Sequence, residues 1–471
     1  MLTKETIATA LTREQGHEVF SRLQKFSTAD EIEVLISGGT SSLTRFANNT
    51  IHQNVSEENC VVSVRSVFGQ RTARATTNKL DDASLRRVVE AAEALAKVQA
   101  PDPDLLPVAD PELAQPAGDV PERSFDATAA LTPEDRAAAV KKMVAVATRN
   151  QLTAAGIFSS SLTAEALLNS RGLAVFHTQT SSEISITMLG EDSSGWQKAN
   201  SPDVRDLDPV GLAETAARKA RESAHPRELA PGKYSVVLEP AAVLDLVGFM
   251  FLDFGGLAVL DQRSFLTGRL GAKLFGDNIT VHDDVYHPLQ SGAPFDGEGV
   301  RRQRVTLVEN GTVRNLVYAR ATAEKMKKSE HAAKVGHIAP TGHGFPLPNE
   351  IGEAPINIVF EGAPESSRRS LEQMIASTDR GVLVTRLWYI REVDPYEKIL
   401  TGMTRDGTFY IEGGSVQHGV RNFRFNESLI HLLSNVVEMG TPVRASGEES
   451  FDMVVPAMKV TDFNFTEVTK F

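Results

Sequence analysis

The sequence feature that most constrains the fold is a hairpin signal near residue 310. Asn310-Gly311 lies between two β-rich runs, Val305–Val308 and Val313–Val317. Asn-Gly supplies the positive φ angles that a two-residue type I′ turn requires. The sequence therefore predicts an antiparallel β-hairpin over Arg304–Tyr318.

A helix and a glycine-rich loop follow this hairpin. Ala319–Lys328 is rich in Ala, Lys, Glu and Met, and this composition predicts a short helix. The next feature is Thr341-Gly342-His343-Gly344, where glycine lets the backbone approach another group closely. A neutral imidazole at His343 would offer one hydrogen-bond donor and one acceptor. We therefore predict a binding site at Thr341, Gly342, His343 and Gly344.

Length and charge narrow the class of protein. A chain of 471 residues favours two or three domains, and 41% hydrophobic residues suffice to fill their cores. The net charge of -12 argues against a nucleic-acid groove, which needs a concentrated basic surface. The single cysteine, Cys60, excludes an internal disulfide and a cysteine-rich zinc module. The sequence shows neither a signal pattern at its start nor an apolar run of about 18 residues, so we expect a soluble cytoplasmic protein without membrane or nucleic-acid partners.

The amino-terminal half alternates helical and β patterns. Thr132-Pro133 has the residues of a helix start, with Thr as the cap and Pro at the first helical position. Prolines recur between residues 100 and 124, and we interpret this stretch as a surface excursion. The predicted helices are Thr3–Phe26, a helix capped by Asp81 or Asp82, Thr132–Asn150 and Asp208–Ala224, and the predicted strands are Glu31–Ile36, Ser42–Phe46, Cys60–Phe68, Ala164–Asn169, Leu173–Gln179 and Glu183–Leu189.

The carboxy-terminal half is mainly β. A boundary is predicted near His225-Pro226, so that residues 1–225 form an amino-terminal α+β domain and residues 226–471 form a β-rich domain with a few helices. The fold class is therefore α+β. The expected strands are Lys233–Leu238, Ile356–Phe360, Gly381–Leu387, Thr408–Glu412 and Val416–Phe425, and the expected helices are Ala241–Phe254, a short one from Glu372 and one from Asn426 that Gly440 ends.

Several of these motifs resemble a known family. Asp296-Gly-Glu298-Gly precedes the hairpin, Thr341-Gly-His-Gly344 follows it, and Gly407-Thr-Phe-Tyr-Ile-Glu-Gly413 and Arg421-Asn-Phe-Arg-Phe425 come later. In this order they resemble the TldD/PmbA family, peptidase family U62, also called modulators of DNA gyrase. The resemblance covers nearly the whole chain. It includes weaker amino-terminal matches at Glu33-Val-Leu, Arg45–Asn49 and Thr77–Leu80.

The chain departs from this family at the metal ligands. The resemblance implies that TldD-type members carry His-Glu-x-x-x-His on the helix after the strand Lys233–Leu238, and a cysteine after the last helix. Here Ala241–Phe254 contains no histidine, and Gly440–Val455 contains no cysteine. A catalytic zinc normally needs three protein ligands. We therefore expect a PmbA/TldE-like member with no catalytic residue, metal ligand or cofactor of its own.

Three hypotheses for the function follow. The resemblance implies that this chain is the zinc-free subunit of a two-component peptidase, in which a TldD-like partner holds the zinc and both subunits enclose unfolded peptide. Thr341–Gly344 would then contact the substrate. A stand-alone hydrolase with a non-metal site and a non-catalytic scaffold or regulator are the alternatives. A homodimer of the isolated chain is also left open.

Other polar residues favour ordinary structural roles. Cys60 lies in an alternating strand and is interpreted as a small core residue. His282 and His287 are expected in a polar loop rather than at a metal, and His331 and His337 are expected to be solvated. The run Asp296, Glu298, Arg301 and Arg302 is interpreted as a solvated loop for its arginines, while the two carboxylates could also form the lip of a cleft.

Overall fold

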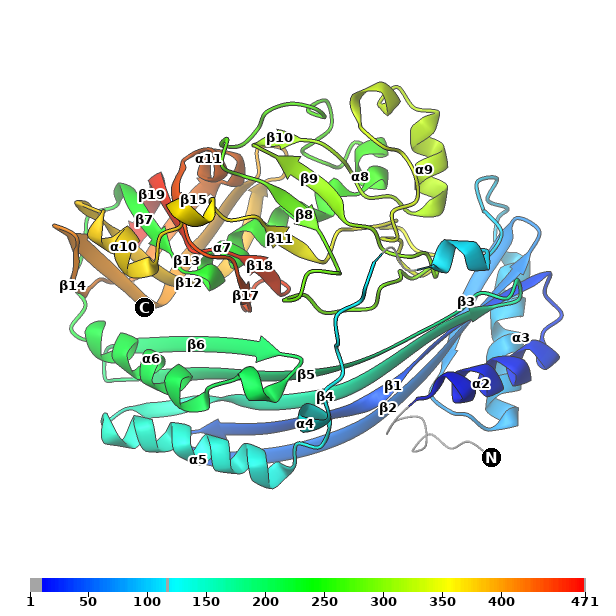
Figure 1. Cartoon of the computed structure of the whole chain (residues 1–471), viewed down its shortest axis with the longest axis horizontal. Coiled ribbons are helices and arrows are strands. Elements are labelled where there is room, and N and C mark those ends of the chain that lie inside the picture. The colour runs from blue at the N-terminus through cyan, green and yellow to red at the C-terminus, as the bar shows by residue number, and fades with distance from the viewer. Residues whose placement is uncertain (1–10, 116–117, 470–471) are drawn as a thin grey trace.

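The computed structural model describes residues 11–115 and 118–469, and its amino-terminal part is built on one antiparallel sheet of six strands in the order β3-β2-β1-β4-β5-β6 (Figure 1). We call it the first sheet. Asn48 and Asn49, with φ angles of 49° and 60°, make the turn between its first two strands. The strands are β1 (Glu31–Ala47), β2 (Thr50–Phe68), β3 (Arg71–Thr77), β4 (Thr153–Asn169), β5 (Ala174–Leu189) and β6 (Ser194–Ser201).

Two pairs of helices pack on the first sheet, one pair at each end (Figure 1). The predicted caps are confirmed at Asp81 and at Thr132, where Pro133 occupies the first turn. The predicted opening helix is confirmed from Arg13, whereas Thr3–Ala10 lies outside the described residues. The helices are α2 (Arg13–Phe26) and α3 (Asp82–Val98) at one end, α5 (Pro133–Arg149) and α6 (Pro209–Glu222) at the other, and the short α4 (Asp126–Ala129).

Each helix pair forms its own core against the same strands. The α2–α3 core includes Ile36 and Val62, and the α5–α6 core includes Phe46 and Ile186. The polar middle of β1, β4 and β5 lies between the two cores. The predicted division of β1 into strands 31–36 and 42–46 and of β5 into 173–179 and 183–189 is therefore wrong, and β4 is much longer than Ala164–Asn169.

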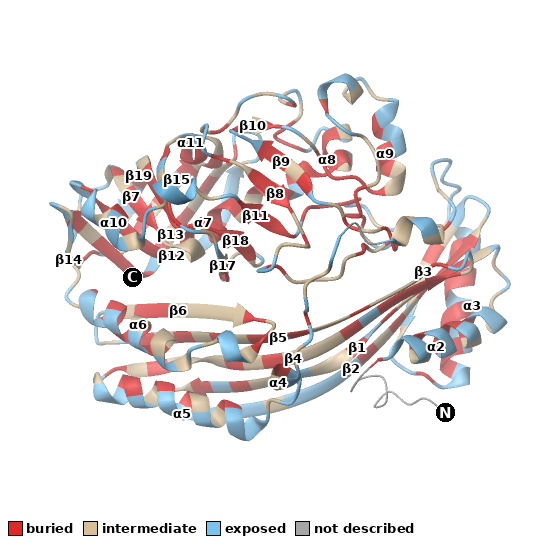
Figure 2. Cartoon of the chain, in the orientation of Figure 1, coloured by how far each residue is buried: buried red, intermediate tan, exposed pale blue. Residues whose placement is uncertain are grey.

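The carboxy-terminal part, residues 232–468, forms a second body that we call the C-terminal body. One sheet has the order β10-β9-β8-β11-β18-β17, and the other has the order β12-β7-β19-β15-β13-β14 with β16 beside β19. Both share one large apolar core, seen as the concentration of buried residues in Figure 2. The fold class is thus confirmed as mixed α and β with a β-rich carboxy-terminal part. The strands are β7 (Gly232–Leu238), β8 (Val281–Asp283), β9 (Val305–Glu309), β10 (Thr312–Val313), β11 (Ile358–Phe360), β12 (Arg380–Asp394), β13 (Ile399–Glu412), β14 (Ser415–Gly419), β15 (Phe423–Ser428), β16 (Val436–Met439), β17 (Val443–Ala445), β18 (Met453–Val455) and β19 (Met458–Val468).

The predicted hairpin is confirmed. Asn310 and Gly311 have φ angles of 47° and 76°, as a type I′ turn requires, and join β9 to β10. The second strand is shorter than expected, because Val317 leaves the hairpin and forms an isolated bridge with Gly255. The helix after the hairpin is confirmed as α9 (Arg320–Lys327).

Two predicted helices are shorter than their apolar patterns suggested. The α-helix from Pro240 ends at Val247, and Gly248–Phe254 continues as a 3₁₀ helix. Ser450 packs so closely against Gly248 that a Cβ there would lie 1.8 Å from its Oγ. The last helix ends at Ser434, since the chain then extends into β16 and pairs with β19. The helices of this body are α7 (Pro240–Val247), α8 (Gly256–Leu260), α9, α10 (Leu371–Ala376) and α11 (Leu429–Ser434).

A proline-rich connecting segment, residues 99–125, joins α3 to α4 and contacts the C-terminal body. Val108 and Ala109 are buried in it, and Ala109 packs with Phe295. The guanidinium of Arg123 donates to the carbonyl oxygens of Val285, His287 and Pro288 at 3.0, 3.0 and 3.1 Å. This segment therefore links the first sheet to the C-terminal body.

Candidate functional site

A cavity of about 440 Å³ lies between the first sheet and the C-terminal body. We call it the central cavity. Its lining is mostly apolar with a few convergent polar side chains, which is the usual composition of a ligand site. The residues that line it are Leu35, Ile36, Ser37, Val61, Ser63, Glu165, Ala166 and Gln179 of the first sheet, and Gly292, Ala293, Phe295, Asp296, Gly297, Arg302, His343, Gly344, Phe345, Pro346, Ala354 and Ile356 of the C-terminal body.

The predicted loop Thr341–Gly344 is divided between this cavity and the core. His343 and Gly344 line the cavity. Thr341 is buried, and its Oγ1 accepts from the backbone N–H of Tyr318 at 2.7 Å. Gly342 has a φ of +74°, and a Cβ there would lie 2.0 Å from the carbonyl oxygen of Arg301. Contact of this loop with a substrate stays a prediction.

The imidazole of His343 is held on both sides. Its Nδ1 lies 3.0 Å from Oγ1 of Thr341, and its Nε2 lies 2.8 Å from Oδ1 of Asp283. Burial acts to raise the pKa of Asp283, but the charge of His343 and backbone N–H donors outweigh it and hold the pKa below its usual range. His343 thus belongs to a buried pair whose ring orientation is fixed.

The carboxylates of the Asp296–Arg302 run are buried rather than solvated. Asp296 accepts from the backbone N–H groups of Glu298 and Val300, both at 2.9 Å, and of Gly344 at 2.7 Å. Burial raises the pKa of Asp296, and burial together with the charge of Asp296 raises the pKa of Glu298 to about 7. Asp296 therefore folds the run into a tight turn and ties it to the predicted loop, whereas Glu298 accepts from the backbone N–H of Arg320 at 3.1 Å.

For Arg302 the solvated-loop interpretation is wrong. Arg301 is half-buried and donates to the carbonyl oxygen of Gln115 at 3.3 Å, but Arg302 is only 8% exposed and lines the cavity. The difference arises because consecutive residues of an extended chain point to opposite sides. Which of the two arginines faces the central cavity therefore depends on how the C-terminal body packs against the first sheet.

Glu165 and His177 are two inward-facing polar residues that the sequence analysis missed. Glu165 lies directly opposite His177 in the pairing of β4 with β5, and opposite Ser37 in the pairing of β4 with β1. Burial raises the pKa of Glu165, partly offset by the charge of Arg302, and burial lowers the pKa of His177. In the sequence, Glu165 stands between two small apolar residues of a predicted strand, at Ala164-Glu165-Ala166. This pattern was the signal that could have identified it as an inward-facing carboxylate.

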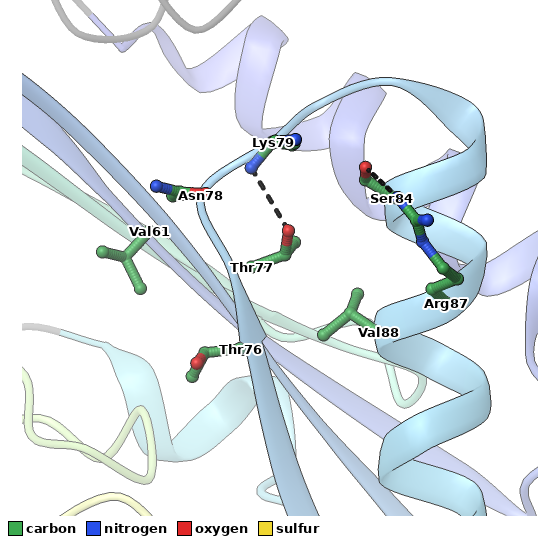
Figure 3. A pocket seen from close by; sticks show the side chains of 8 residues that line it. All are labelled: Val61, Thr76, Thr77, Asn78, Lys79, Ser84, Arg87 and Val88. Atoms are coloured by element: carbon green, nitrogen blue, oxygen red, sulfur yellow. Dashed lines mark hydrogen bonds between the residues drawn. The ribbon is translucent and has the colours of Figure 1, made fainter.

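The other candidates have structural surroundings. Cys60 is fully buried in the α2–α3 core, as predicted. His282 is buried in β8, not in a polar loop, and its ring bonds Thr306 and Glu361 at 3.1 and 2.5 Å. A second cavity of about 520 Å³ lies where β3 leads into α3 (Figure 3), but its polar groups bond locally, Lys79 N–H to Thr77 and Arg87 to Ser84.

The described residues do not fit a zinc site. No group of three His, Cys, Asp or Glu side chains is placed to hold a metal ion within residues 11–115 and 118–469. The helix α7, where the resemblance implies metal ligands, instead places Ala242, Val243, Leu246 and Val247 in the apolar core. Its one acid, Asp245, accepts backbone N–H groups of Glu448 and Glu449. In the same described part, no helix is long and apolar enough to cross a membrane.

Comparison with known families gives three consecutive matches. Residues 32–96 match the PmbA/TldA metallopeptidase domain 1, and residues 126–224 match the PmbA/TldA metallopeptidase central domain. Residues 231–467, half of the chain, match the PmbA/TldA metallopeptidase C-terminal domain. The first and second matches together span the first sheet.

Individual relatives agree with these matches. The chain is 24% identical to Metalloprotease PmbA of Escherichia coli O157:H7, covering 98% of this chain and 96% of the relative. It is 22% identical to the Metalloprotease PmbA homolog of Haemophilus influenzae, covering 84% of each chain. Its fold is similar to that of TldE from Thermococcus kodakarensis, with a TM-score of 0.82, 21% identity, and coverage of 96% of this chain and 99% of that one.

Proposed function

Because this chain belongs to the PmbA/TldD family of metallopeptidases, we propose that it is the zinc-free subunit of a two-component peptidase. In this role it pairs with a zinc-bearing TldD-type subunit, helps to enclose the reaction chamber and holds unfolded peptide. The zinc and the hydrolytic step belong to the partner.

The observation that carries this proposal is the packing of α7. A metal-binding helix must present its ligands to an open space where water and substrate can enter. Here the corresponding helix is buried on nearly all sides, and Ala242, Leu244, Leu246 and Val247 are each 0% exposed. Introducing two histidines would therefore disrupt a core instead of completing a site.

The central cavity supports the peptide-holding part of the proposal. Its volume of about 440 Å³ lies within the range of small-ligand sites. The side chains of Glu165 and Gln179 line it from the first sheet, and those of Asp296, Arg302 and His343 line it from the C-terminal body. Polar side chains of these kinds can bond to the carbonyl and N–H groups of an extended peptide.

Co-expression tests the proposal directly. We expect this chain and a TldD-type protein with His-Glu-x-x-x-His from the same genome to co-purify as a stoichiometric complex that contains zinc and cleaves unfolded peptides. The isolated chain is expected to contain no stoichiometric zinc and to cleave nothing. Peptide cleavage by the isolated chain would instead support a stand-alone hydrolase. A stable complex whose activity matches that of the partner alone would leave only a scaffold role.

A further inference from the structure

Two buried side chains around the central cavity carry nitrogen atoms that have neither a hydrogen-bond partner nor an ion-pair partner among the described residues. Arg302 is 8% exposed and its Nη1 is buried without a partner among the described residues. His177 is 9% exposed, and its Nε2 is likewise buried without a hydrogen-bond partner among the described residues. Buried polar groups are normally paired. These two therefore indicate hydrogen-bonding capacity that the described part of the chain does not use.

Glu165 adds an acceptor beside them. The charge of Arg302 partly offsets the effect of burial on the pKa of this carboxyl. Residues directly opposite each other on neighbouring antiparallel strands have Cβ atoms about 5 Å apart, so Glu165 and His177 share one face of the first sheet. Arg302 approaches this face from the C-terminal body, and both it and Glu165 line the cavity.

The charges of this cluster favour a neutral ligand. The guanidinium of Arg302 also acts on Asp283 and Asp296. Those two carboxylates already have their own donors, namely His343 and backbone N–H groups. The positive charge of Arg302 is thus surrounded by negative charge, although its N–H groups are not all bonded. A ligand of this cluster must bring a hydrogen-bond acceptor without adding another full negative charge.

A peptide group meets these requirements. Its carbonyl oxygen accepts from a guanidinium, and its N–H donates to a carboxylate. The rest of the lining is apolar and includes Leu35, Val61, Phe295, Phe345 and Ile356. We propose that the central cavity binds the main chain of an extended peptide, with Arg302 donating to a carbonyl oxygen, Glu165 accepting from an N–H, His177 adding a bond on the sheet side, and an apolar side chain entering the cavity. This inference rests on the proposed function and identifies the recognition groups.

Binding of a blocked peptide to the full chain tests this assignment. The probe is a fluorescent peptide of sequence Ala-Leu-Leu-Ala with an amidated carboxyl end, measured by anisotropy. Arg302→Lys keeps the positive charge but loses the planar guanidinium with its several N–H donors, and it should weaken binding about tenfold. Glu165→Ala removes the acceptor and should weaken binding by a similar factor. The matched control is Arg301→Met, which alters the adjacent arginine outside the cavity and should bind like the wild type.

A modified ligand gives a second test that does not depend on the folding of a variant. N-methylation of each peptide bond in turn removes one N–H donor. At one position it should weaken binding to the wild type about tenfold but leave binding to Glu165→Ala unchanged. The proposal is overturned if wild type, Arg302→Lys and Glu165→Ala bind the probe equally. It is also overturned if the peptide with a free carboxylate binds about tenfold more tightly than the amidated one, which would assign Arg302 to a carboxylate.

The two proposals fail in different ways. If the pair with a TldD-type subunit cleaves peptides and the cavity variants bind the probe normally, this inference is wrong and the proposed function stands. If the chain binds the probe through Arg302 and Glu165 but forms no active pair, the subunit role is wrong.

Discussion

Gly342 occupies a position that no residue with a side chain can share without distortion. Its φ of +74° is unfavourable for other residues, and a Cβ would lie 2.0 Å from the carbonyl oxygen of Arg301. That carbonyl belongs to the residue before Arg302. Any change at Gly342 is therefore transmitted directly to the arginine of the central cavity.

We expect Gly342→Ala to lower the free energy of unfolding by about 3 kcal/mol or more, because backbone strain and steric overlap add. Gly268 is a matched control, since its φ is +77° and nothing lies within 4 Å of a Cβ there. Gly268→Ala should lower it by only about 1–2 kcal/mol. Urea unfolding of both variants measures the two losses in the free energy of unfolding. Equal losses would show that the backbone shifts enough to remove the steric overlap between a Cβ at position 342 and the carbonyl oxygen of Arg301.

His343 shows what single residues reveal before the structure is known. The sequence places it in a glycine-rich loop, and the structure brings part of that loop to the central cavity. Its partner Asp283 is 60 positions earlier in β8, and no local pattern joins the two. The same holds for Arg302 and Glu165, which come from different bodies. Side-chain type and loop position were thus readable, but pairs formed by tertiary packing were not.

At the scale of elements, two cores on one set of strands explain the main errors of prediction. In β1 the apolar residues Ile36 and Phe46, which belong to different cores, are separated by a polar, glycine-containing stretch. Alternation of apolar and polar residues reports burial, so a strand that is buried only at its ends reads as two strands. The caps and the Asn-Gly turn were readable because they depend on local geometry.

Helix α7 contains an ionisable group whose effect on stability depends on pH. Asp245 is fully buried, and burial raises its pKa to about 7, although the N–H groups of Glu449 and Glu448 and the charge of Arg386 lower it. The folded state therefore binds this proton more tightly than the unfolded chain. The contribution of Asp245 to stability decreases as pH rises from about 4 to about 7.

Asp245→Asn should remove this dependence. Relative to the wild type, we expect the variant to gain stability between pH 4 and pH 7, by on the order of 4 kcal/mol in total, and to keep a constant difference above pH 7. Chemical unfolding at several pH values provides the measurement. A stability difference that does not change with pH would contradict the assignment of the raised pKa to Asp245.

At the scale of the whole molecule, the connecting segment joins the two bodies through Arg123. Burial and the charge of Arg444 lower the pKa of Arg123 to about 10, so it stays charged at neutral pH. Its three carbonyl acceptors lie in Val285–Pro288, beside the loop that leads to the central cavity. This side chain therefore supports the wall of the cavity from outside.

Arg123→Met should lower the free energy of unfolding by about 2 kcal/mol, because one buried and two partly buried carbonyl groups lose a charged donor. Hydrogen exchange should become faster around residues 285–290 before it changes elsewhere. Arg205→Met is the control, since Arg205 is exposed and pairs with the nearby Asp203. It should change stability by less than about 0.5 kcal/mol. Unchanged exchange around residues 285–290 in Arg123→Met would exclude the supporting role.

The position of the connecting segment also has a consequence during synthesis. Chains fold as they emerge from the ribosome, amino terminus first. The strands of the first sheet all lie before residue 202, so their ladder can form early. Arg123, however, must wait for acceptors that are 162 to 165 residues further along. If synthesis stalls before residue 285, the connecting segment is exposed without the carbonyl groups that Arg123 binds. This proline-rich segment is then accessible to proteases and chaperones.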